Sequence, residues 1–265
     1  MSDEQAAKIR TDIPHSARIW NYWMGGKDNY EIDRIAGDTG IAVYPDITRM
    51  ASQSRQFLIR AVRFLAGEAG IRQFLDIGTG LPTMQNTHEV AQSVAPEAKV
   101  VYVDNDPLVL AHADALLTSM TVEGDATYIN ADFTAPERIL AEAREMLDFD
   151  QPIAVMFMGV LGHVGADEDM LRIVRTVMDA VPSGSYLTLY DGTTDDQGYV
   201  TLCEEYAKTG GAPYLPRERS VIRAAFDGLD MMEPGFVSIT AWRPDEAQVG
   251  VPQVIGAYCA VAKKP

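Results

Sequence analysis

Short apolar runs typical of buried strands alternate with helical patterns along most of the chain, and this alternation constrains the fold more than any other feature. Five such runs are expected to be strands, at 73–78, 99–104, 127–132, 153–158 and 185–190. Strands that alternate with helices build a parallel sheet with helices on both faces. The sequence therefore predicts an α/β fold with a doubly wound, Rossmann-like sheet.

The end of the chain departs from this alternation. Two further strands are expected, at 236–242 and 254–261, with no helical pattern between them. Neighbouring strands without a crossover helix pair in antiparallel fashion. We therefore predict a seven-stranded sheet that is mostly parallel and has a reversed strand at its C-terminal edge.

About 70 residues of helix and loop precede the first expected strand. Helical spacing of apolar residues predicts helices over about 14–24, 29–36 and 46–67. Asp28, with Glu31 three residues later, is typical of a capping box for the second of them. We predict two parts, an N-terminal helical cap over 1–70 and a sheet domain over 71–265.

The chain is strongly acidic, with 22 Lys and Arg against 38 Asp and Glu and a formal net charge of −16. Such a surface repels phosphate backbones and anionic lipids, so we expect no nucleic-acid partner and no membrane partner. The N-terminus lacks the apolar core of a secretory signal. The two cysteines suit a reducing compartment, and we expect a cytoplasmic protein.

The first expected strand runs into a glycine-rich turn, Asp76-Ile-Gly-Thr-Gly-Leu-Pro82. In a doubly wound sheet the ligand crevice lies beyond the carboxyl ends of the strands, and glycines there let the backbone approach a ligand closely. A lone pair of glycines is also common in turns with a purely structural role. The third glycine of a dinucleotide fingerprint is absent and Pro82 has no N–H for a pyrophosphate, so we expect neither NAD nor FAD.

Carboxylates follow the second and third expected strands. Asp104 is placed to accept hydrogen bonds from both hydroxyls of a ribose, whereas Asp106 is typical of an N-cap for the helix that starts at Pro107. Asp132, followed by Phe133, can bond an adenine amino group and pack on its ring, although such pairs also occur in ordinary loops. These positions predict a nucleoside ligand without a pyrophosphate.

His163 follows the fourth expected strand, at the mouth of the crevice. With a reference pKa of about 6.5, a histidine there can act as a general base near neutral pH. The alternative is a loop histidine that is bonded to the backbone. Neither a zinc nor a calcium ligand pattern is present, so we expect no metal.

The strand-end motifs DIGTG (76–80), VYVDND (101–106) and NADF (130–133) together resemble those of class I S-adenosylmethionine (SAM)-dependent methyltransferases. More specific segments are RIWNYWMGGKDNY (18–30), FDGL (226–229), EPG (233–235) and WRPD (242–245). These resemble one bacterial S-adenosyl methyltransferase family that was long known as a domain of unknown function. The resemblance covers roughly residues 13–264 and implies a class I methyltransferase fold with SAM as the cofactor.

The resemblance also implies roles for individual residues. The methionine part of the cofactor would face the turn that contains Asp76, Gly78 and Gly80, and Asp104 would hold the ribose. The residues implied near adenine are Asn105, Asp132 and Phe133. The N-terminal signature would fold over the pocket as part of a lid, through Tyr22, Met24, Gly25, Gly26 and Asn29. Gly159, after the fourth strand, completes the predicted cofactor-binding set.

The acceptor substrate is expected beyond the fourth and fifth strands, where the sequence departs from the family pattern. After the fourth strand the family usually carries an apolar residue, a histidine and an aromatic residue in succession, whereas this chain has Met-Gly-Val-Leu-Gly-His over 158–163. Residues 190–192, after the fifth strand, also differ from the family pattern. We predict a pocket walled by Gly159, His163, Tyr190 and Asp191. The predicted catalytic residues are His163, Asp191 and Tyr190, with His163 or Asp191 as the base for an acceptor that must lose a proton.

We therefore predict that the protein transfers a methyl group from SAM to a small-molecule acceptor, which the acidic charge favours as neutral or cationic. Two alternatives stay open. One is a different displacement on SAM, such as an intramolecular cyclisation that releases methylthioadenosine. The other is a non-catalytic SAM-binding module. The products separate the three hypotheses, since they are S-adenosylhomocysteine, methylthioadenosine or neither.

Overall fold

The fold is built on an eight-stranded mixed sheet. The computed structural model describes residues 9–82, 85–116, 122–245 and 254–265, and of 112–116 the backbone alone. The strand order is β3-β2-β1-β4-β5-β8-β6, and β7 also pairs with β8. The parallel strands are β1 (Gln73–Ile77), β2 (Lys99–Asp104), β3 (Asp125–Asn130), β4 (Ala154–Met158) and β5 (Tyr186–Gly192). The predicted doubly wound α/β architecture is confirmed.

The C-terminal strand β8 (Ala257–Lys263) runs antiparallel to β5, as the missing crossover helix predicts. Two short strands, β6 (Asp230–Met231) and β7 (Val237–Ser238), pair with the other side of β8. The sheet therefore has eight strands instead of the expected seven, and the reversed strand lies inside its edge.

The expected strand over 236–242 is reduced to β7 because the backbone after it turns toward α4 (Ile47–Gly67). Arg60, a buried residue of α4, donates hydrogen bonds to the carbonyl oxygens of Ile239 (2.6 Å) and Trp242 (2.9 Å). Carbonyls that are satisfied in this way do not join a strand ladder. Residues 239–242 are thus held by α4 through these two carbonyl oxygens.

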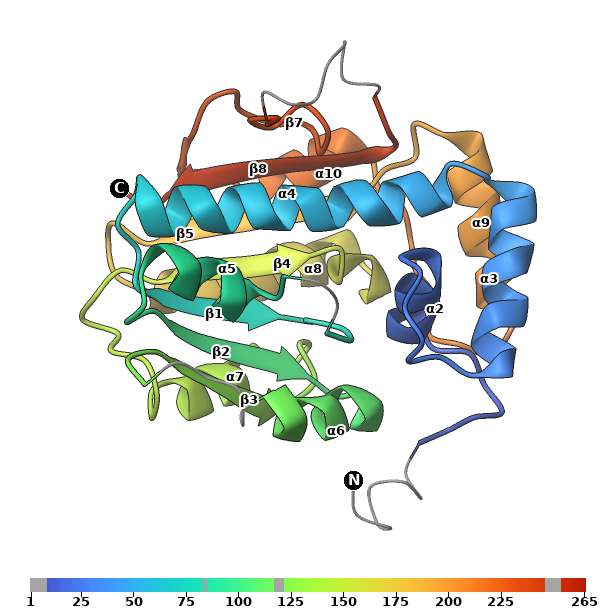
Figure 1. The fold of residues 1–265 in the computed structure, drawn as a ribbon. Coiled ribbons are helices and arrows are strands. Elements are labelled where there is room, and N and C mark those ends of the chain that lie inside the picture. The colour runs from blue at the N-terminus through green and yellow to red at the C-terminus, as the bar shows by residue number, and fades with distance from the viewer. Residues whose placement is uncertain (1–8, 83–84, 117–121, 246–253) are drawn as a thin grey trace.

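Helices cover both faces of the sheet (Figure 1). One face carries α4 and α5 (Thr87–Val94), and the other carries α7 (Pro136–Ala143), α8 (Asp167–Ala180) and α10 (Arg219–Ala224). Beside β3 lies α6 (Pro107–Leu116). Each face has its own hydrophobic cluster. No helix in the described ranges is both long and apolar enough to cross a membrane.

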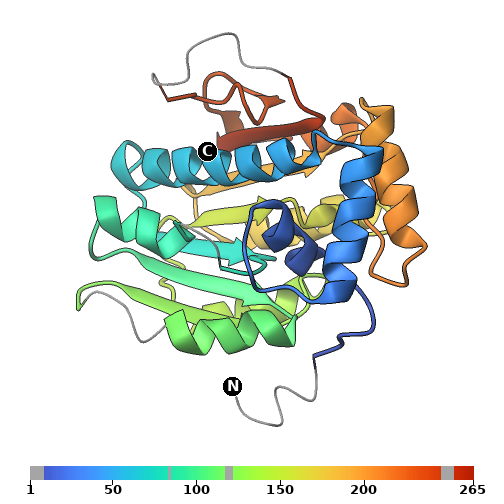
Figure 2. The ribbon, with the colours of Figure 1, turned by 45° about the vertical axis from the view of Figure 1, so that its right-hand side comes forward.

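Three further helices stand at the carboxyl ends of the parallel strands, namely α2 (Ser16–Trp23), α3 (Glu31–Val43) and α9 (Gln197–Ala207). Figure 2 shows α2 in front of the strand ends, with α3 beside it. The contacts of α3 with both α2 and α9 join the three helices into one group. The first predicted helix is therefore confirmed, and it lies where a lid over the strand ends was expected.

The second helix begins later than predicted and is longer. Its N-cap is Tyr30, because the side chain of Asp33 accepts a hydrogen bond from the Tyr30 N–H (2.9 Å). The predicted pairing of Asp28 with Glu31 as a capping box is therefore wrong. The residue that reaches back to the start of the helix lies two positions after Glu31.

The third strand also differs from its expected range, 127–132. Its register is set by pairing with β2, in which the last partners are Asp104 and Asn130. Asp132 consequently lies in the loop after β3 and not in the strand. This shift moves its carboxylate to the same edge of the sheet as Asp104.

The division into 1–70 and 71–265 stays a prediction. Residues 1–8 lie outside the described ranges. The helix α4 falls in the first part, yet its side chains Phe57 and Phe64 belong to the same hydrophobic cluster as Phe74 of β1. In its packing, α4 is part of the sheet's core.

We expect Arg60→Met to lower the free energy of unfolding by about 2–4 kcal/mol, because two buried carbonyl oxygens lose their charged donor. Urea unfolding followed by circular dichroism measures the change. Arg63 is exposed on the same helix, and Arg63→Met should stay within about 0.5 kcal/mol of the parent. An Arg60→Met protein as stable as the parent would contradict the role of this contact.

Candidate functional site

A cavity of about 340 Å³ opens at the carboxyl ends of the parallel strands, where the doubly wound topology places a ligand site. Its floor is made by loops after the strands, at 78–81, 104–105, 131–134 and 158–160. Its walls come from two helices and their flanks. They include His15, Ser16, Ala17, Trp20 and Met24 around α2, and Ser54, Arg55 and Leu58 on α4.

The floor depends on a close approach between the loops after β1 and β4. Gly78 has a φ of +75°, and a Cβ at this position would lie 2.3 Å from the side chain of Val160. Gly159 has a φ of +77°, and its Cβ would lie 2.7 Å from the hydroxyl of Tyr190. A left-handed backbone and this lack of space both require glycine. The two predicted glycines therefore shape the cavity that they line.

Asp104 organises the loops on either side of it. Its Oδ2 accepts a hydrogen bond from the Gly80 N–H (2.8 Å), and its Oδ1 accepts one from the Asp106 N–H (2.9 Å). Burial raises the pKa of the Asp104 carboxyl. A carboxylate has about four acceptor positions, so roughly two remain for the hydroxyls of a bound diol.

The residues predicted near adenine lie beside Asp104. Asn105 donates from Nδ2 to Oδ2 of Asp132 (3.3 Å). The other oxygen of Asp132 accepts from the backbone N–H (2.9 Å) and the hydroxyl (2.7 Å) of Thr134. Phe133 packs against the hydrophobic cluster beneath it. The structure thus brings Asp104, Asn105, Asp132 and Phe133 to one end of the cavity.

Asp76 is placed differently, because its side chain is buried and is not part of the cavity wall. Its Oδ2 accepts a hydrogen bond from the Thr87 hydroxyl (2.6 Å), and its Oδ1 has no partner among the described residues. Burial raises the pKa of Asp76 to about 6. The residue joins β1 to the start of α5, and its contact with a ligand stays a prediction.

Met24 lines the cavity, whereas Gly25, Gly26 and Asn29 form the turn between α2 and α3. Asn29 donates from Nδ2 to the side-chain oxygen of Asn21 (3.1 Å) and to the carbonyl oxygen of Gly26 (3.0 Å). These contacts shape the turn. The structure therefore gives these three residues a place behind the cavity, where they position α2.

Tyr22 also faces away from the cavity, and its hydroxyl donates to Asp38 (2.7 Å). Residues at and before the start of α2 that were not predicted do line it, among them His15, Ser16, Ala17 and Trp20. Ser16, Trp20 and Met24 recur every fourth residue, which places them on one face of a helix. That spacing was the signal that could have found them.

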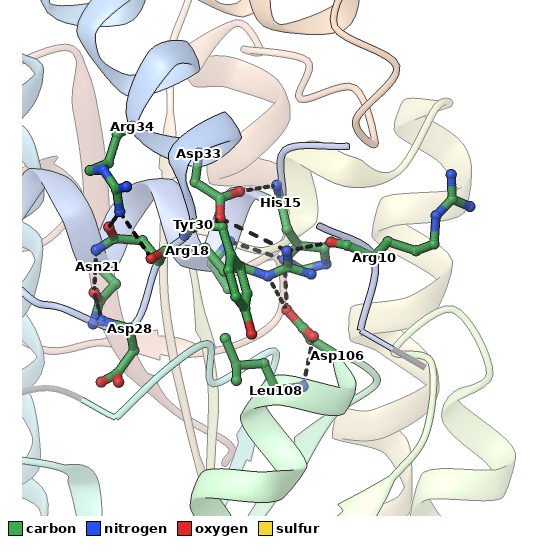
Figure 3. Close-up of polar contacts among 12 residues, drawn as sticks. Arg10, His15, Arg18, Asn21, Asp28, Tyr30, Asp33, Arg34, Asp106 and Leu108 are labelled. Carbon is green, nitrogen blue, oxygen red and sulfur yellow. Dashed lines mark hydrogen bonds and ion pairs between the residues drawn. The ribbon is translucent and has the colours of Figure 1, made fainter. Parts of the chain in front are cut away.

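A buried charged cluster holds α2 against the rest of the site (Figure 3). Arg18 Nε lies 3.4 Å from Oδ2 of Asp106, and its Nη1 lies 3.8 Å from Oδ2 of Asp33. His15 Nδ1 lies 3.1 Å from the same oxygen of Asp106. Asp106 also accepts from the Leu108 N–H (2.9 Å), which confirms it as the cap of α6. The cluster joins α2, α3 and the start of α6.

His163 lines the cavity from the short helix η2 (Leu161–His163). Its Nδ1 lies 2.8 Å from the carbonyl oxygen of Pro213. Because a carbonyl can only accept, Nδ1 carries the proton and Nε2 keeps its lone pair. Burial lowers the pKa of His163, so the ring is neutral at pH 7. The backbone bond expected for a loop histidine is present, and it leaves the second nitrogen able to take a proton.

Tyr190 lines the cavity but Asp191 does not. Neighbouring residues of a strand point to opposite faces, and Asp191 lies behind Tyr214, whose hydroxyl donates to its Oδ1. Burial raises the pKa of Asp191 to about 6 and that of Tyr190 to about 12. Of the two predicted bases, His163 is therefore the one at the cavity. A catalytic role for Asp191 or Tyr190 stays a prediction.

The contribution of α4 to the cavity was not predicted. Ser54, Arg55 and Leu58 face it, and an arginine beside the buried residues Phe57 and Leu58 was the available signal. Within the described part of the chain, His, Cys, Asp and Glu side chains form no group of three or more that could hold a metal ion. The site therefore offers glycine loops, carboxylates, two histidines and one arginine as its main polar chemistry.

We expect Arg18→Met to speed amide hydrogen exchange in residues 16–23 at least tenfold, because two buried carboxylates lose their counter-charge. Exchange measured by mass spectrometry on the ligand-free protein checks this. Lys27→Met changes an exposed cation in the adjacent turn and should leave the exchange of α2 unchanged. Equal exchange in Arg18→Met and the parent would show that packing alone holds the helix.

Comparison with known proteins identifies the chain. The model of a family described as S-adenosyl methyltransferase matches residues 2–265. A solved structure of a DUF574 family protein from Streptomyces avermitilis is 43% identical, covers 96% of this chain and 99% of its own, and has a TM-score of 0.91. A candidate methyltransferase from Thermobifida fusca is 39% identical over 96% of each chain, with a TM-score of 0.87. No curated protein matches.

The family match spans nearly the whole chain and agrees with the fold and with the loops that surround the cavity. It confirms the resemblance found in the strand-end motifs and in the N-terminal signature. The cofactor is SAM, and the protein is an enzyme that uses it for methyl transfer. The chain belongs to the S-adenosyl methyltransferase family.

Proposed function

We propose that the enzyme methylates a small-molecule acceptor held in the cavity, and that neutral His163 takes the proton which the acceptor loses. The observation that carries this is the contact of His163 Nδ1 with the carbonyl oxygen of Pro213 (2.8 Å), from which we infer that Nδ1 holds the proton and Nε2 the lone pair. Bound SAM supplies a methyl group that its sulfonium already activates. An alcohol, phenol or ammonium acceptor must lose a proton near the time of transfer, and a neutral imidazole can accept it.

The cavity residues fit SAM as the cofactor. Asp104 keeps roughly two acceptor positions, which matches the two hydroxyls of a ribose. Asp132 and Phe133 offer an acceptor and an apolar surface for an adenine. Gly78 and Gly80 line the cavity, and glycines there let a ligand approach the backbone closely. In this arrangement the enzyme's main contribution is to align the reactants and to keep water away from them.

A neutral or cationic acceptor suits the charges around the site. The chain carries a net charge of −16, and the carboxylates of Asp104 and Asp132 line the cavity. A negative wall of this kind disfavours anionic molecules. Cys203 and Cys259 are buried free thiols, which supports the expectation of an enzyme of the reducing cytoplasm.

We expect Asp104→Ala to weaken SAM binding at least tenfold, because the charge-assisted hydrogen bonds to the ribose are each worth about 1.5–3 kcal/mol. Isothermal titration calorimetry measures the affinity. Asp227 is exposed and lies outside the cavity, and Asp227→Ala is the matched control. Unchanged affinity in Asp104→Ala would remove the residue from the cofactor site.

We expect His163→Gln to lower kcat at least tenfold while the Kd for SAM stays nearly unchanged, because the glutamine keeps polarity but cannot act as a base. The pH profile gives a second measurement. Since the folded pKa of His163 lies below its ordinary value, the parent rate should hold near pH 7 and fall only in more acidic solution. That acid limb should disappear in the variant. If turnover in His163→Gln equals that of the parent, alignment alone carries the reaction.

Product analysis separates methyl transfer from the two alternatives. S-adenosylhomocysteine should accumulate when the enzyme, SAM and an acceptor from a screened library are combined. If the enzyme with SAM alone forms methylthioadenosine faster than SAM does in buffer, the reaction is cyclisation and not methyl transfer. SAM binding with neither product across the library would favour a non-catalytic module.

A further inference from the structure

Arg55 is a cation at the cavity that forms no hydrogen bond or ion pair with another described residue. It lies on α4, is half-buried, and lines the cavity beside Ser54 and Leu58. None of the hydrogen bonds or ion pairs among the described residues involves its guanidinium, and its interactions are with more distant charges. Its guanidinium carries five N–H donors, and none of them has an acceptor among the described residues.

The two carboxylates that influence Arg55 most are engaged elsewhere. Asp76 accepts a hydrogen bond from the hydroxyl of Thr87 (2.6 Å). Glu89 accepts one from the N–H of Asn86 (2.8 Å), where it caps α5. Asp76 influences Arg55 through its charge, without a hydrogen bond or ion pair between the two side chains. Among the described residues, no carboxylate therefore pairs directly with the Arg55 guanidinium.

An uncompensated charge in a partly buried position costs stability, unless a ligand supplies the opposite charge. Burial lowers the pKa of Arg55, which reflects this cost, although an arginine stays charged at neutral pH. The planar guanidinium matches a carboxylate, which it can bind through two parallel hydrogen bonds. The ligand chemistry that Arg55 fits is therefore a carboxylate.

The polarity of the cavity indicates which carboxylate this is. One end carries Asp104 and Asp132, which suit the ribose hydroxyls and the amino group of an adenosine. Arg55 interacts instead with Asp76 of β1, the strand whose glycine loop is expected to face the methionine part of the cofactor. SAM has the same order of groups, with an adenosine at one end and an amino-acid carboxylate at the other.

We propose that Arg55 binds the carboxylate of the amino-acid arm of SAM and so fixes that arm along the glycine loop. The inference rests on the proposed use of this cavity for SAM, and it adds the residue that recognises the end of the cofactor opposite to adenine. It also accounts for an arginine in a cavity whose other charges are acidic. With Arg55 engaged by the cofactor, the described wall offers an anionic acceptor no unpaired arginine or lysine.

The test compares two ligands that differ by one carboxylate, S-adenosylhomocysteine and its decarboxylated analogue. Calorimetry gives the affinity of each for the parent, Arg55→Met and Arg55→Lys. We expect Arg55→Met to bind S-adenosylhomocysteine about 10- to 100-fold more weakly and the analogue within about twofold of the parent. Arg55→Lys keeps the charge but loses the paired geometry, and it should lie between the two.

Two further measurements exclude a merely structural effect. Arg63→Met, on the exposed side of the same helix, should bind both ligands as the parent does. Ligand-free Arg55→Met should be at least as resistant to urea as the parent, because it loses a charge that has no partner in the protein.

Unchanged affinity of Arg55→Met for S-adenosylhomocysteine would overturn the assignment, and so would an equal loss for both ligands. Turnover does not enter this measurement. Failure of the base assigned to His163, or of every acceptor, therefore leaves the inference intact. Conversely, equal binding by Arg55→Met and the parent leaves methyl transfer intact. If the parent binds neither ligand, this inference and the proposed use of the cavity both fail.

Discussion

The loops around the cavity depend on one carboxylate, that of Asp104. One of its oxygens holds the backbone N–H of Gly80 and the other holds that of Asp106. Asp106 in turn caps α6 and pairs with Arg18 of α2. The loop after β1, the loop after β2 and the covering helix are therefore linked through two neighbouring acidic residues. The residues that end β2 thus position both the loops at the floor of the site and the helix α2 that covers it.

Burial gives the acidic residues of the site different tasks. Burial raises the pKa of all three carboxyls, but Asp104 lines the cavity, whereas Asp76 and Asp191 are enclosed by protein. The enclosed carboxylates each accept a hydrogen bond from a hydroxyl, of Thr87 or of Tyr214. Their place is in the framework behind the cavity. The charge available to ligands is accordingly concentrated in a few residues on its wall.

The apolar runs and the residues after them predicted the parts of the fold and of the site that lie where the parallel strands end, at one edge of the sheet. The apolar runs placed the five parallel strands, and the residues that follow them, such as Asp104 and Gly78, met at the cavity as expected. Asp191 did not, because strand alternation turns it away once Tyr190 faces the cavity. The sequence shows that Tyr190 and Asp191 point to opposite faces of the sheet, but it does not show which of the two faces the cavity.

Features that depend on distant partners were beyond local reasoning. The strand expected over 236–242 is short because Arg60 donates hydrogen bonds to its carbonyls from a helix that lies 182 residues before Trp242 in the sequence. Arg55 faces the cavity because the apolar face of α4 packs on the sheet, and this packing decides which neighbouring positions turn inward. The spacing of apolar residues predicts which face of a long helix is buried, but the tertiary fold decides which element packs against that face.

The hydrogen bond from His163 to the carbonyl of Pro213 also determines where positive charge resides during the proposed reaction. Loss of the methyl group neutralises the sulfonium, and uptake of the acceptor's proton at Nε2 makes the imidazole ring cationic. With a neutral acceptor, the cavity carries the same total charge before and after transfer. The positive charge lost from the sulfonium thus reappears on the imidazole, and the dipoles around the cavity need little reorientation. Departure of that proton to solvent is then the step that restores the enzyme.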